Sequence, residues 1–365
     1  MTDEDPASSR PATALTRVVV RGLIAFQPAH APRWPVALQA ALSMFLPVMF
    51  FTLIGQPGVG MMAAGGAFTA IYLVGAAPSV RIRLLPVVGM TLIACAALGT
   101  VLAPFPLLAA VGLVLVTVGV SALYYAVRVG PPGPVFFVLV YGLATRVTGE
   151  VDGHRLVHPL VFLGALALGV VVSYAVAAIA MLIGRIRHGA HPGGGLRLER
   201  RPRLDAEQGA LVIRIALVAV IGTVLSVLVV DPARGYWVVC AGVAVVGVNA
   251  GRRVALVRGS QRFVGTVVGA ALFTVLALLP IPSLLLPALL GVLQFSVEIF
   301  VVRNYALALV FITPLVLFII TAVAGLHGTL TIALVGERVV DTLVGAVLGA
   351  VTGVVHPRDR RTALA

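Results

Sequence analysis

Residues 107–127 read LLAAVGLVLVTVGVSALYYAV and are followed by Arg128. This stretch carries no charged side chain, and it is as long as a helix that crosses a bilayer, which needs roughly 20 residues. Apolar runs of similar length recur between residues 36 and 355. The chain is 60% hydrophobic and 11% charged, whereas a soluble domain is about 25% charged. The sequence therefore predicts an all-α integral membrane protein.

The charge balance is strongly basic, with a formal net charge of +13 from 26 basic and 13 acidic residues. Every basic residue is an arginine, and most arginines stand in short gaps between apolar runs. This placement is typical of the positive-inside rule, so we do not expect a nucleic-acid partner. A chain without lysine cannot form the lysine-containing loop that binds ATP phosphates. We see no catalytic constellation and no metal spacing, and we expect neither an enzyme nor a cofactor.

Twelve spans are predicted, six in each half of the chain. They cover residues 35–54, 58–75, 84–103, 107–127, 134–147, 159–184, 209–230, 236–250, 263–279, 283–302, 305–324 and 338–355. The corresponding domains are a cytoplasmic N-terminal segment (1–34), a first six-helix repeat (35–184), an Arg-rich cytoplasmic linker (185–208), a second six-helix repeat (209–356) and a cytoplasmic tail (357–365). Residues 18–26 are expected to form a short interfacial helix.

The two halves align when the chain is shifted along itself so that Pro57 falls on Pro232. The same shift superposes Gly60 on Gly235, Arg83 on Arg258 and Arg128 on Arg303. Because six spans per half is an even number, the halves have the same orientation and form a parallel repeat. With the N-terminus in the cytoplasm, most of the arginines also lie on the cytoplasmic side. We therefore expect a multi-pass protein of the bacterial plasma membrane with both termini cytoplasmic.

Arg128 and Arg303 occupy the same position at the cytoplasmic end of the fourth span of each half. Two guanidiniums near a symmetry axis could bind an anion bidentately, and the ordinary alternative is a pair of snorkelling anchors. Asn304 and Tyr305, which follow Arg303, are further candidates for substrate binding. Trp237 and Asn249 bracket a short glycine-bearing span and join this group. Trp237 at a span end is more often an interface anchor.

The densest charge cluster near a span consists of Glu337, Arg338 and Asp341, which share one helix face by their spacing. If the last helix begins at Arg338, the cluster is an ion pair at the outer rim. If that helix begins near Thr329, the cluster lies inside the membrane and a carboxylate there could carry a proton. Glu298 is a third candidate for proton coupling, and pairing with Arg252 or Arg253 is its ordinary alternative.

The second half of the chain resembles the fusaric acid resistance (FUSC) type of aromatic acid exporter. The motifs that carry the resemblance are Gly235-Tyr236-Trp237, Gly251-Arg252-Arg253, Arg262 with Gly265 and Gly269, Arg303-Asn304-Tyr305-Ala306 with Pro314, and Arg338-Val339-Val340-Asp341-Thr342 with Gly345. The resemblance implies a bacterial transporter that moves small aromatic acids outward. Plant aluminium-activated malate channels are distantly similar, which implies that the architecture also passes anions as a channel. The first half departs from the pattern, with Met61 and Met62 where Tyr and Trp would stand.

Taken together, these observations favour a secondary transporter of small organic acids that exports its substrate and is proton-coupled. The expected partners are a small organic anion and membrane lipids, and the sequence leaves a homo-oligomer open. Two alternatives remain: a passive anion channel of the same architecture, and a non-transporting membrane scaffold for an envelope enzyme.

Overall fold

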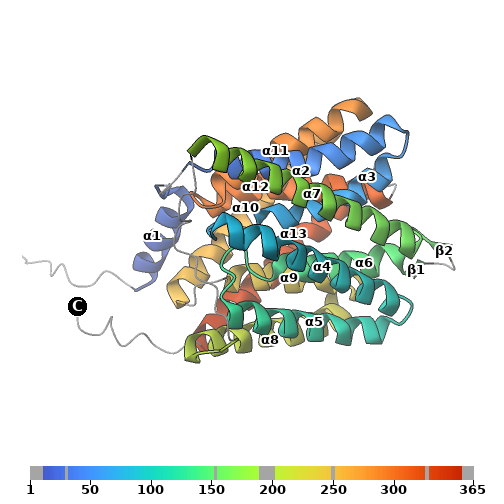
Figure 1. Cartoon of the computed structure of the whole chain (residues 1–365). Helices are drawn as coiled ribbons and strands as arrows, with labels where there is room; N and C mark the ends of the chain where they lie inside the picture. The colour runs from blue at the N-terminus through green and yellow to red at the C-terminus, as the bar shows by residue number, and fades with distance from the viewer. Residues whose placement is uncertain are drawn as a thin grey trace, which may run out of the picture.

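The computed structural model describes residues 11–28, 32–151, 154–188, 202–247, 251–324 and 329–355. These residues form a bundle of helices. A hairpin of two strands, each two residues long, lies at the end of the bundle opposite α1 (Figure 1). The elements are α1 Pro11–Ile24, α2 Trp34–Leu53, α3 Pro57–Ala64, α4 Pro78–Leu102, α5 Pro106–Val127, α6 Val135–Thr148, β1 Glu150–Val151, β2 His154–Arg155, α7 Pro159–His188, α8 Ala206–Leu225, α9 Gly235–Val246, α10 Arg252–Leu278, α11 Leu286–Phe300, α12 Tyr305–Ala324 and α13 Thr329–Val351.

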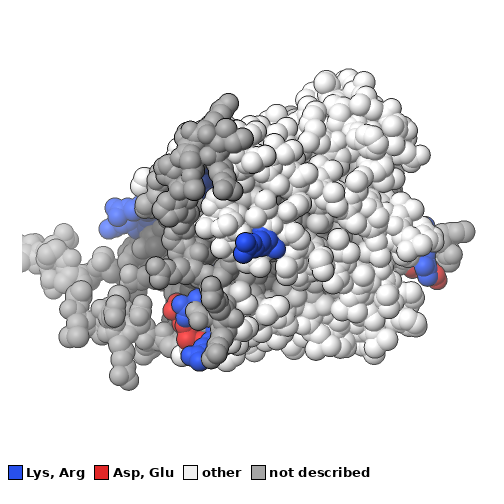
Figure 2. All heavy atoms as spheres, viewed as in Figure 1, with Lys and Arg blue, Asp and Glu red and all other residues white. Residues whose placement is uncertain are grey.

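Eight helices of the described residues are long and apolar enough to cross a membrane. Three shorter apolar helices accompany them, at 57–71, 135–148 and 232–246, and α13 is long but carries charged residues. A broad uncharged area separates charged groups at the two ends on the face that Figure 2 shows, interrupted by one basic group. The prediction of a multi-pass all-α membrane protein is therefore confirmed.

Proline marks where several of these helices begin. It occupies the first or second position of α2, α3, α4 and α5, where a missing backbone N–H costs nothing because it would have no partner within the helix. The start of α8 is fixed differently, by a capping box. Asp205 accepts from the backbone N–H of Gln208, and the Gln208 side chain accepts from the backbone N–H of Asp205.

Two helices begin well before the starts that the sequence predicts for their spans, and those predicted starts are wrong. Helix α4 begins at Pro78 rather than 84, and α10 begins at Arg252 rather than 263. Helix α13 begins at Thr329, the earlier of the two starts that the sequence left open. The reason is that arginines assigned to loops lie on helices and are buried by protein. Arg81 is an example, because it donates to the carbonyl oxygens of Ala70 (2.5 Å) and Tyr72 (3.3 Å), which end the adjoining 3-10 helix.

The short helices lie in the interior of the bundle. Helix α3 continues as a 3-10 helix over Gly65–Ile71, all of whose residues are buried, and eleven of the twelve residues of α9 are buried. Helices as short as these cannot by themselves span a hydrocarbon core of about 30 Å. Broken or short helices are tolerated at membrane depth where the surrounding protein encloses them, which is the case here.

The two predicted halves meet through matching helix pairs. Helix α2 packs against α11, and α8 packs against α5, so the first helix of each half contacts the fourth helix of the other. In the same way, α3 contacts α12 and α9 contacts α6, which are the second and fifth helices of each half. The short helices α3 and α9 therefore lie where the halves meet.

Glycine allows the closest of these approaches. A Cβ atom at Gly169 of α7 would collide with the carbonyl oxygen of Ala63, and one at Gly345 of α13 would collide with the carbonyl oxygen of Val238. Helices α7 and α13 thus lie directly against the short helices α3 and α9. Gly345 and Gly349 are four residues apart, a spacing typical of close helix packing by small residues, and both lie against α9.

Helix α1 lies against α10 and the corner between α11 and α12, at the opposite end of the bundle from β1 and β2 (Figure 1). Gln261 donates to the carbonyl oxygen of Gly22 (2.8 Å), and the backbone N–H of Gln27 donates to the carbonyl oxygen of Arg303 (2.9 Å). The interfacial helix predicted over 18–26 thus begins at Pro11 and ends at Ile24.

Candidate anion site between α9, α10 and α13

The charged cluster of α13 lies in the middle of that helix. Because α13 begins at Thr329, Asp341 is about 18 Å along it, given the rise of about 1.5 Å per residue. Of the two starts that the sequence left open, the structure has the early one. Arg338 and Asp341 are buried, and Glu337 is half-buried. The cluster therefore lies within the bundle and not at the first turn of the helix.

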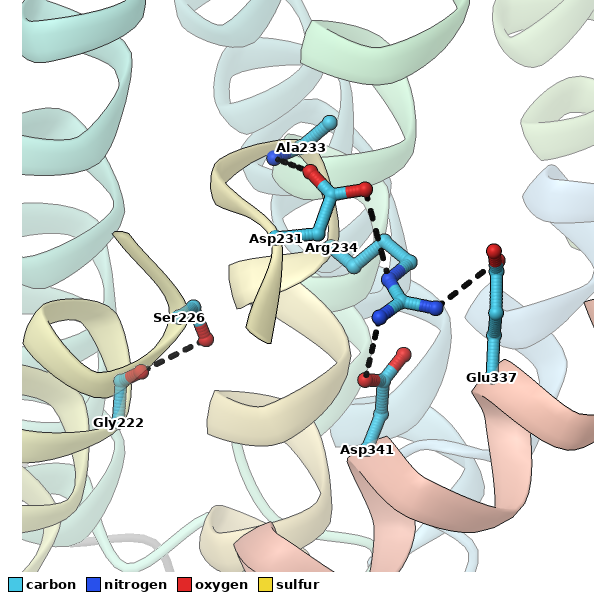
Figure 3. A network of polar contacts seen from close by, with 7 residues as sticks. All are labelled: Gly222, Ser226, Asp231, Ala233, Arg234, Glu337 and Asp341. Carbon is cyan, nitrogen blue, oxygen red and sulfur yellow. Dashed lines mark hydrogen bonds and ion pairs between the residues drawn. The ribbon is translucent and has the colours of Figure 1, made fainter. Parts of the chain in front are cut away.

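Arg234 connects this cluster to the turn before α9 (Figure 3). Its guanidinium lies 3.0 Å from Glu337 Oε2, 3.6 Å from Asp231 Oδ2 and 3.8 Å from Asp341 Oδ1. The side chains of Asp231 and Glu337 are 41% and 43% exposed, whereas that of Asp341 is 1% exposed. The sequence analysis assigned no role to Arg234 and missed this network, although the position of Arg234 three residues after Asp231 was a signal for local pairing.

The carboxylate of Asp341 is poorly satisfied. Both of its oxygens are buried and have no hydrogen-bond partner among the described residues. The 3.8 Å contact with Arg234 is an ion pair but is too long for a hydrogen bond. A buried carboxylate without hydrogen bonds is costly, so Asp341 is suited to gaining a partner, either a proton or a cation.

Arg338 lies one helical turn from Asp341, with its guanidinium carbon 3.9 Å from the centre of the Trp237 ring. Its Nε and Nη1 atoms are buried and find no hydrogen-bond partner in the described part of the chain. The interaction with the ring stabilises the cation, but it leaves these donors unused. Trp237 itself is 5% exposed and packs against Tyr236, so its interpretation as a membrane-interface anchor is wrong. The third position of α9 lies inside the protein.

A second buried guanidinium belongs to Arg262 of α10. Its Nη1 donates to the hydroxyl oxygen of Tyr305 at 2.8 Å, and its Nε has no partner among the described residues. The guanidinium carbon of Arg258 also lies over the Tyr305 ring, 5.1 Å from the centre of that ring. Arg262 and Arg338 are close enough to repel each other electrostatically. The arrangement thus gathers positive charge with free donors between α10 and α13.

The structure does not gather Arg128 and Arg303 into this site. Arg128 ends α5 in a left-handed conformation (φ 58°), is exposed, and pairs with Asp205 at 2.9 Å. Arg303 is exposed in the turn between α11 and α12. Arg128 follows α5, which packs against α8, whereas Arg303 follows α11, which packs against α2.

Other predicted site residues have structural partners. Asn304 caps α12 by accepting from the backbone N–H of Leu307 (3.0 Å), and it donates to the carbonyl oxygen of Leu23 (2.8 Å). Glu298 is buried and pairs with Arg33 at 3.4 Å. The side chains of Arg252 and Arg253, its other candidate partners, lie outside the described residues. Asn249 lies outside the described residues.

An apolar cavity adjoins the site. It is lined by residues of α3 and its 3-10 continuation, α6, α7 and α12, together with Trp237 of α9. Its volume is about 30 Å³ in this conformation, which is room for about two water molecules. Trp237 therefore borders both the cavity and the guanidinium of Arg338.

Comparison with known families finds a match to the part of the chain that contains these residues. Residues 215–352 match the model of the family described as fusaric acid resistance protein-like. The match includes Trp237, Arg262, Tyr305, Arg338 and Asp341 and leaves out the first half of the chain. No curated protein and no solved structure matches the chain significantly. The second half of this membrane protein is therefore a fusaric acid resistance protein-like region, which confirms the family that its sequence resembles.

Proposed function

We propose that this protein is a secondary transporter of small organic acids, that aromatic acids are its substrates, and that it is a proton-coupled exporter. The observation that carries the proposal is the guanidinium of Arg338, which is buried against Trp237 with two nitrogen atoms that lack hydrogen-bond partners among the described residues. The family match supports a transport role for a membrane protein of this kind.

A carboxylate is the ligand that fits Arg338 best. The guanidinium group presents its donors in a planar fork that binds a carboxylate through two parallel hydrogen bonds. A charged side chain at the centre of a membrane helix costs about 2.5–3.5 kcal/mol on insertion scales. That cost is offset when an anion occupies the site. Arg262 adds positive charge nearby, and its Nε is also unused.

Asp341 is the residue that we assign to proton coupling. Its carboxylate faces charged and titratable groups from three segments, namely Arg338 and Glu337 of α13, Asp231 and Arg234 of the turn before α9, and Tyr236 of α9. The ionised carboxylate competes with a substrate carboxylate for Arg338. A proton on an Asp341 oxygen removes that competition, so that proton binding and anion binding at Arg338 favour each other.

The proposal includes twelve membrane-crossing segments in two parallel repeats at residues 35–184 and 209–356, with both termini in the cytoplasm of a bacterial cell. The matching contacts of α2 with α11 and of α8 with α5 support the repeat. The uncharged flank between charged ends supports the membrane placement (Figure 2). Labelling of single cysteines introduced at Ser8 and Ser283 tests the orientation. A membrane-impermeant reagent added outside cells should label only the second.

Transport assays in proteoliposomes test the function. Labelled benzoate is the probe, with and without a pH gradient, and the variants are Arg338→Gln and Asp341→Asn. We expect benzoate flux driven by the gradient, its loss in Arg338→Gln, and flux that no longer responds to the gradient in Asp341→Asn. Arg128→Gln is the matched control, because Arg128 is exposed and pairs with Asp205 instead of a residue of α13.

Each part of the proposal can fail separately. Absence of flux for every acid tested would overturn the substrate class, and flux that ignores the gradient in the unmodified protein would overturn the coupling. Single-channel currents in planar bilayers would identify a passive anion channel instead. Size-exclusion elution of each variant as one symmetric peak excludes misfolding as the cause of lost flux.

A further inference from the structure

The shift that superposes Pro57 on Pro232 also relates the polar cluster to a set of apolar residues in the first half. Each residue around Arg338 has an apolar or small counterpart at the shifted position. The shift pairs Trp237 with Met62, Cys240 with Gly65, Glu337 with Phe162, and Asp341 with Leu166. The first half therefore has no ionisable side chain at the positions that correspond to Glu337, Arg338 and Asp341.

These four counterparts all line the apolar cavity, together with Trp237. The helices that carry them correspond as well. Helix α7 packs on α3 and its 3-10 continuation in the first half, as α13 packs on α9 in the second half. The cavity is thus the counterpart of the charged cluster, and Trp237 is the wall that the two share.

We propose that the first half of the chain forms an apolar pocket for the ring or alkyl chain of the acid whose carboxylate binds to Arg338. In this proposal, Met62, Phe162 and Leu166 set the size of the ring or chain that fits. This inference rests on the proposed function, because it assigns the remainder of the same substrate. Arg338 supplies the charged contact next to Trp237. The cavity that Trp237 also lines is almost wholly apolar.

The chemistry of the two compartments defines the substrate class. An amphipathic monocarboxylate places its charge at Arg338 and buries its ring or alkyl chain among apolar side chains, which is favourable because apolar surface leaves water. A dicarboxylate such as malate has to place a second charge in the cavity, where no lining residue can pair with it. The cavity of about 30 Å³ is too small for a ring or alkyl chain of this kind in the present conformation. Binding therefore requires the lining side chains to separate.

Binding measurements test the pocket independently of transport. The full chain in lipid nanodiscs is titrated by calorimetry with benzoate, 2-naphthoate and malate, and empty nanodiscs serve as the blank. Leu166→Ala enlarges the cavity, and we expect it to raise the affinity for 2-naphthoate relative to benzoate about tenfold. Leu168→Ala is the matched control, because this leucine of the same helix is 38% exposed and lies outside the cavity. Malate should bind at least about tenfold more weakly than benzoate to the unmodified protein.

A second variant changes the cavity in the opposite direction. A Cβ atom at Gly65 would lie 3.2 Å from Leu166 Cδ1, so Gly65→Ala narrows the cavity and should lower the preference for 2-naphthoate. Its control is Gly164→Ala, where a Cβ atom meets nothing within 4 Å. The preference for 2-naphthoate over benzoate is expected to rise in Leu166→Ala and to fall in Gly65→Ala. A general loss of folding cannot produce these opposite changes.

The outcomes separate this inference from the proposed function. Acid binding that is lost in Arg338→Gln but keeps the same size preference in Leu166→Ala and Gly65→Ala would overturn the pocket and leave the transporter standing. Malate binding as tight as benzoate binding would overturn it as well. Size-dependent binding without any flux in proteoliposomes would support the pocket and overturn the proposed function.

Discussion

Replacement of Arg234 by glutamine tests the network around Asp341 most directly. The guanidinium of Arg234 lies within 4 Å of three carboxylates, and its side chain is only 15% exposed. Glutamine keeps much of the side-chain volume but removes the charge. The substitution therefore leaves Asp341, Glu337 and Asp231 without their common cation.

The size of the effect follows from the burial of each partner. Asp231 and Glu337 are more than a third exposed, so water screens them and each of these pairs contributes about 0–1 kcal/mol. Asp341 is 1% exposed, and removal of the partner of a buried charge costs about 3–5 kcal/mol. We therefore expect Arg234→Gln to lower the free energy of unfolding by about 3–5 kcal/mol at neutral pH, almost entirely through Asp341.

The assay is reversible unfolding by SDS in mixed micelles, followed by circular dichroism. Arg128→Gln is the control, since it breaks the Arg128–Asp205 ion pair, whose side chains are 52% and 49% exposed. This control should cost less than about 1 kcal/mol. In a background with Asp341→Asn, the cost of Arg234→Gln should fall to about 1 kcal/mol, because the buried charge is gone.

Two results would refute this reasoning. An equal loss in Arg234→Gln and Arg128→Gln would mean that the burial of Asp341 has no energetic consequence. A cost of Arg234→Gln that stays the same in the Asp341→Asn background would mean that the arginine acts through other contacts.

Three further predictions concern the packing that holds the site. Gly169→Leu should abolish folding because its side chain would overlap the backbone of α3, whereas Gly164→Ala should be neutral; yield of monodisperse protein measures both. Asn304→Ala should lower the free energy of unfolding by about 0.5–2 kcal/mol, because α12 loses its cap. The same substitution should speed tryptic cleavage of α1, because Asn304 no longer binds the carbonyl oxygen of Leu23. Unchanged cleavage would show that this contact does not hold α1. Arg33→Gln should destabilise more than Arg33→Gln combined with Glu298→Gln in SDS unfolding, because the single change leaves a buried carboxylate unpaired; equal losses would show that the carboxylate needs no partner.

The membrane character of the chain could be predicted from its sequence because it depends on local properties. Runs such as 107–127 are long enough to span a bilayer and too apolar for water, and a helix satisfies its own backbone hydrogen bonds. The family resemblance was also predictable, because its motifs at Trp237, Arg303 and Arg338 follow one another in a set order and spacing along the chain. Both depend on residues that are neighbours in sequence.

Helix starts were less predictable where charges meet apolar sequence. Arg262 and Arg338 were assigned to span edges because exposed arginines usually stand there, yet both are buried on helices that begin earlier. A guanidinium can lie within the protein when a tyrosine hydroxyl or a tryptophan ring faces it, as Tyr305 and Trp237 do here. Those partners come from other helices, so local sequence contains no sign of them.

The sequence alone thus determined the membrane character and the helical class of this protein and the family that its second half resembles, because hydrophobic length and motif order are properties of the chain itself. Only the tertiary structure decided which charges form a site. It paired Arg128 with Asp205, brought Arg234 to Asp341, and placed the cavity beside Trp237. The physical reason is that contact between distant segments depends on which short helices become buried between the halves, and small residues such as Gly169 and Gly345 allow that approach.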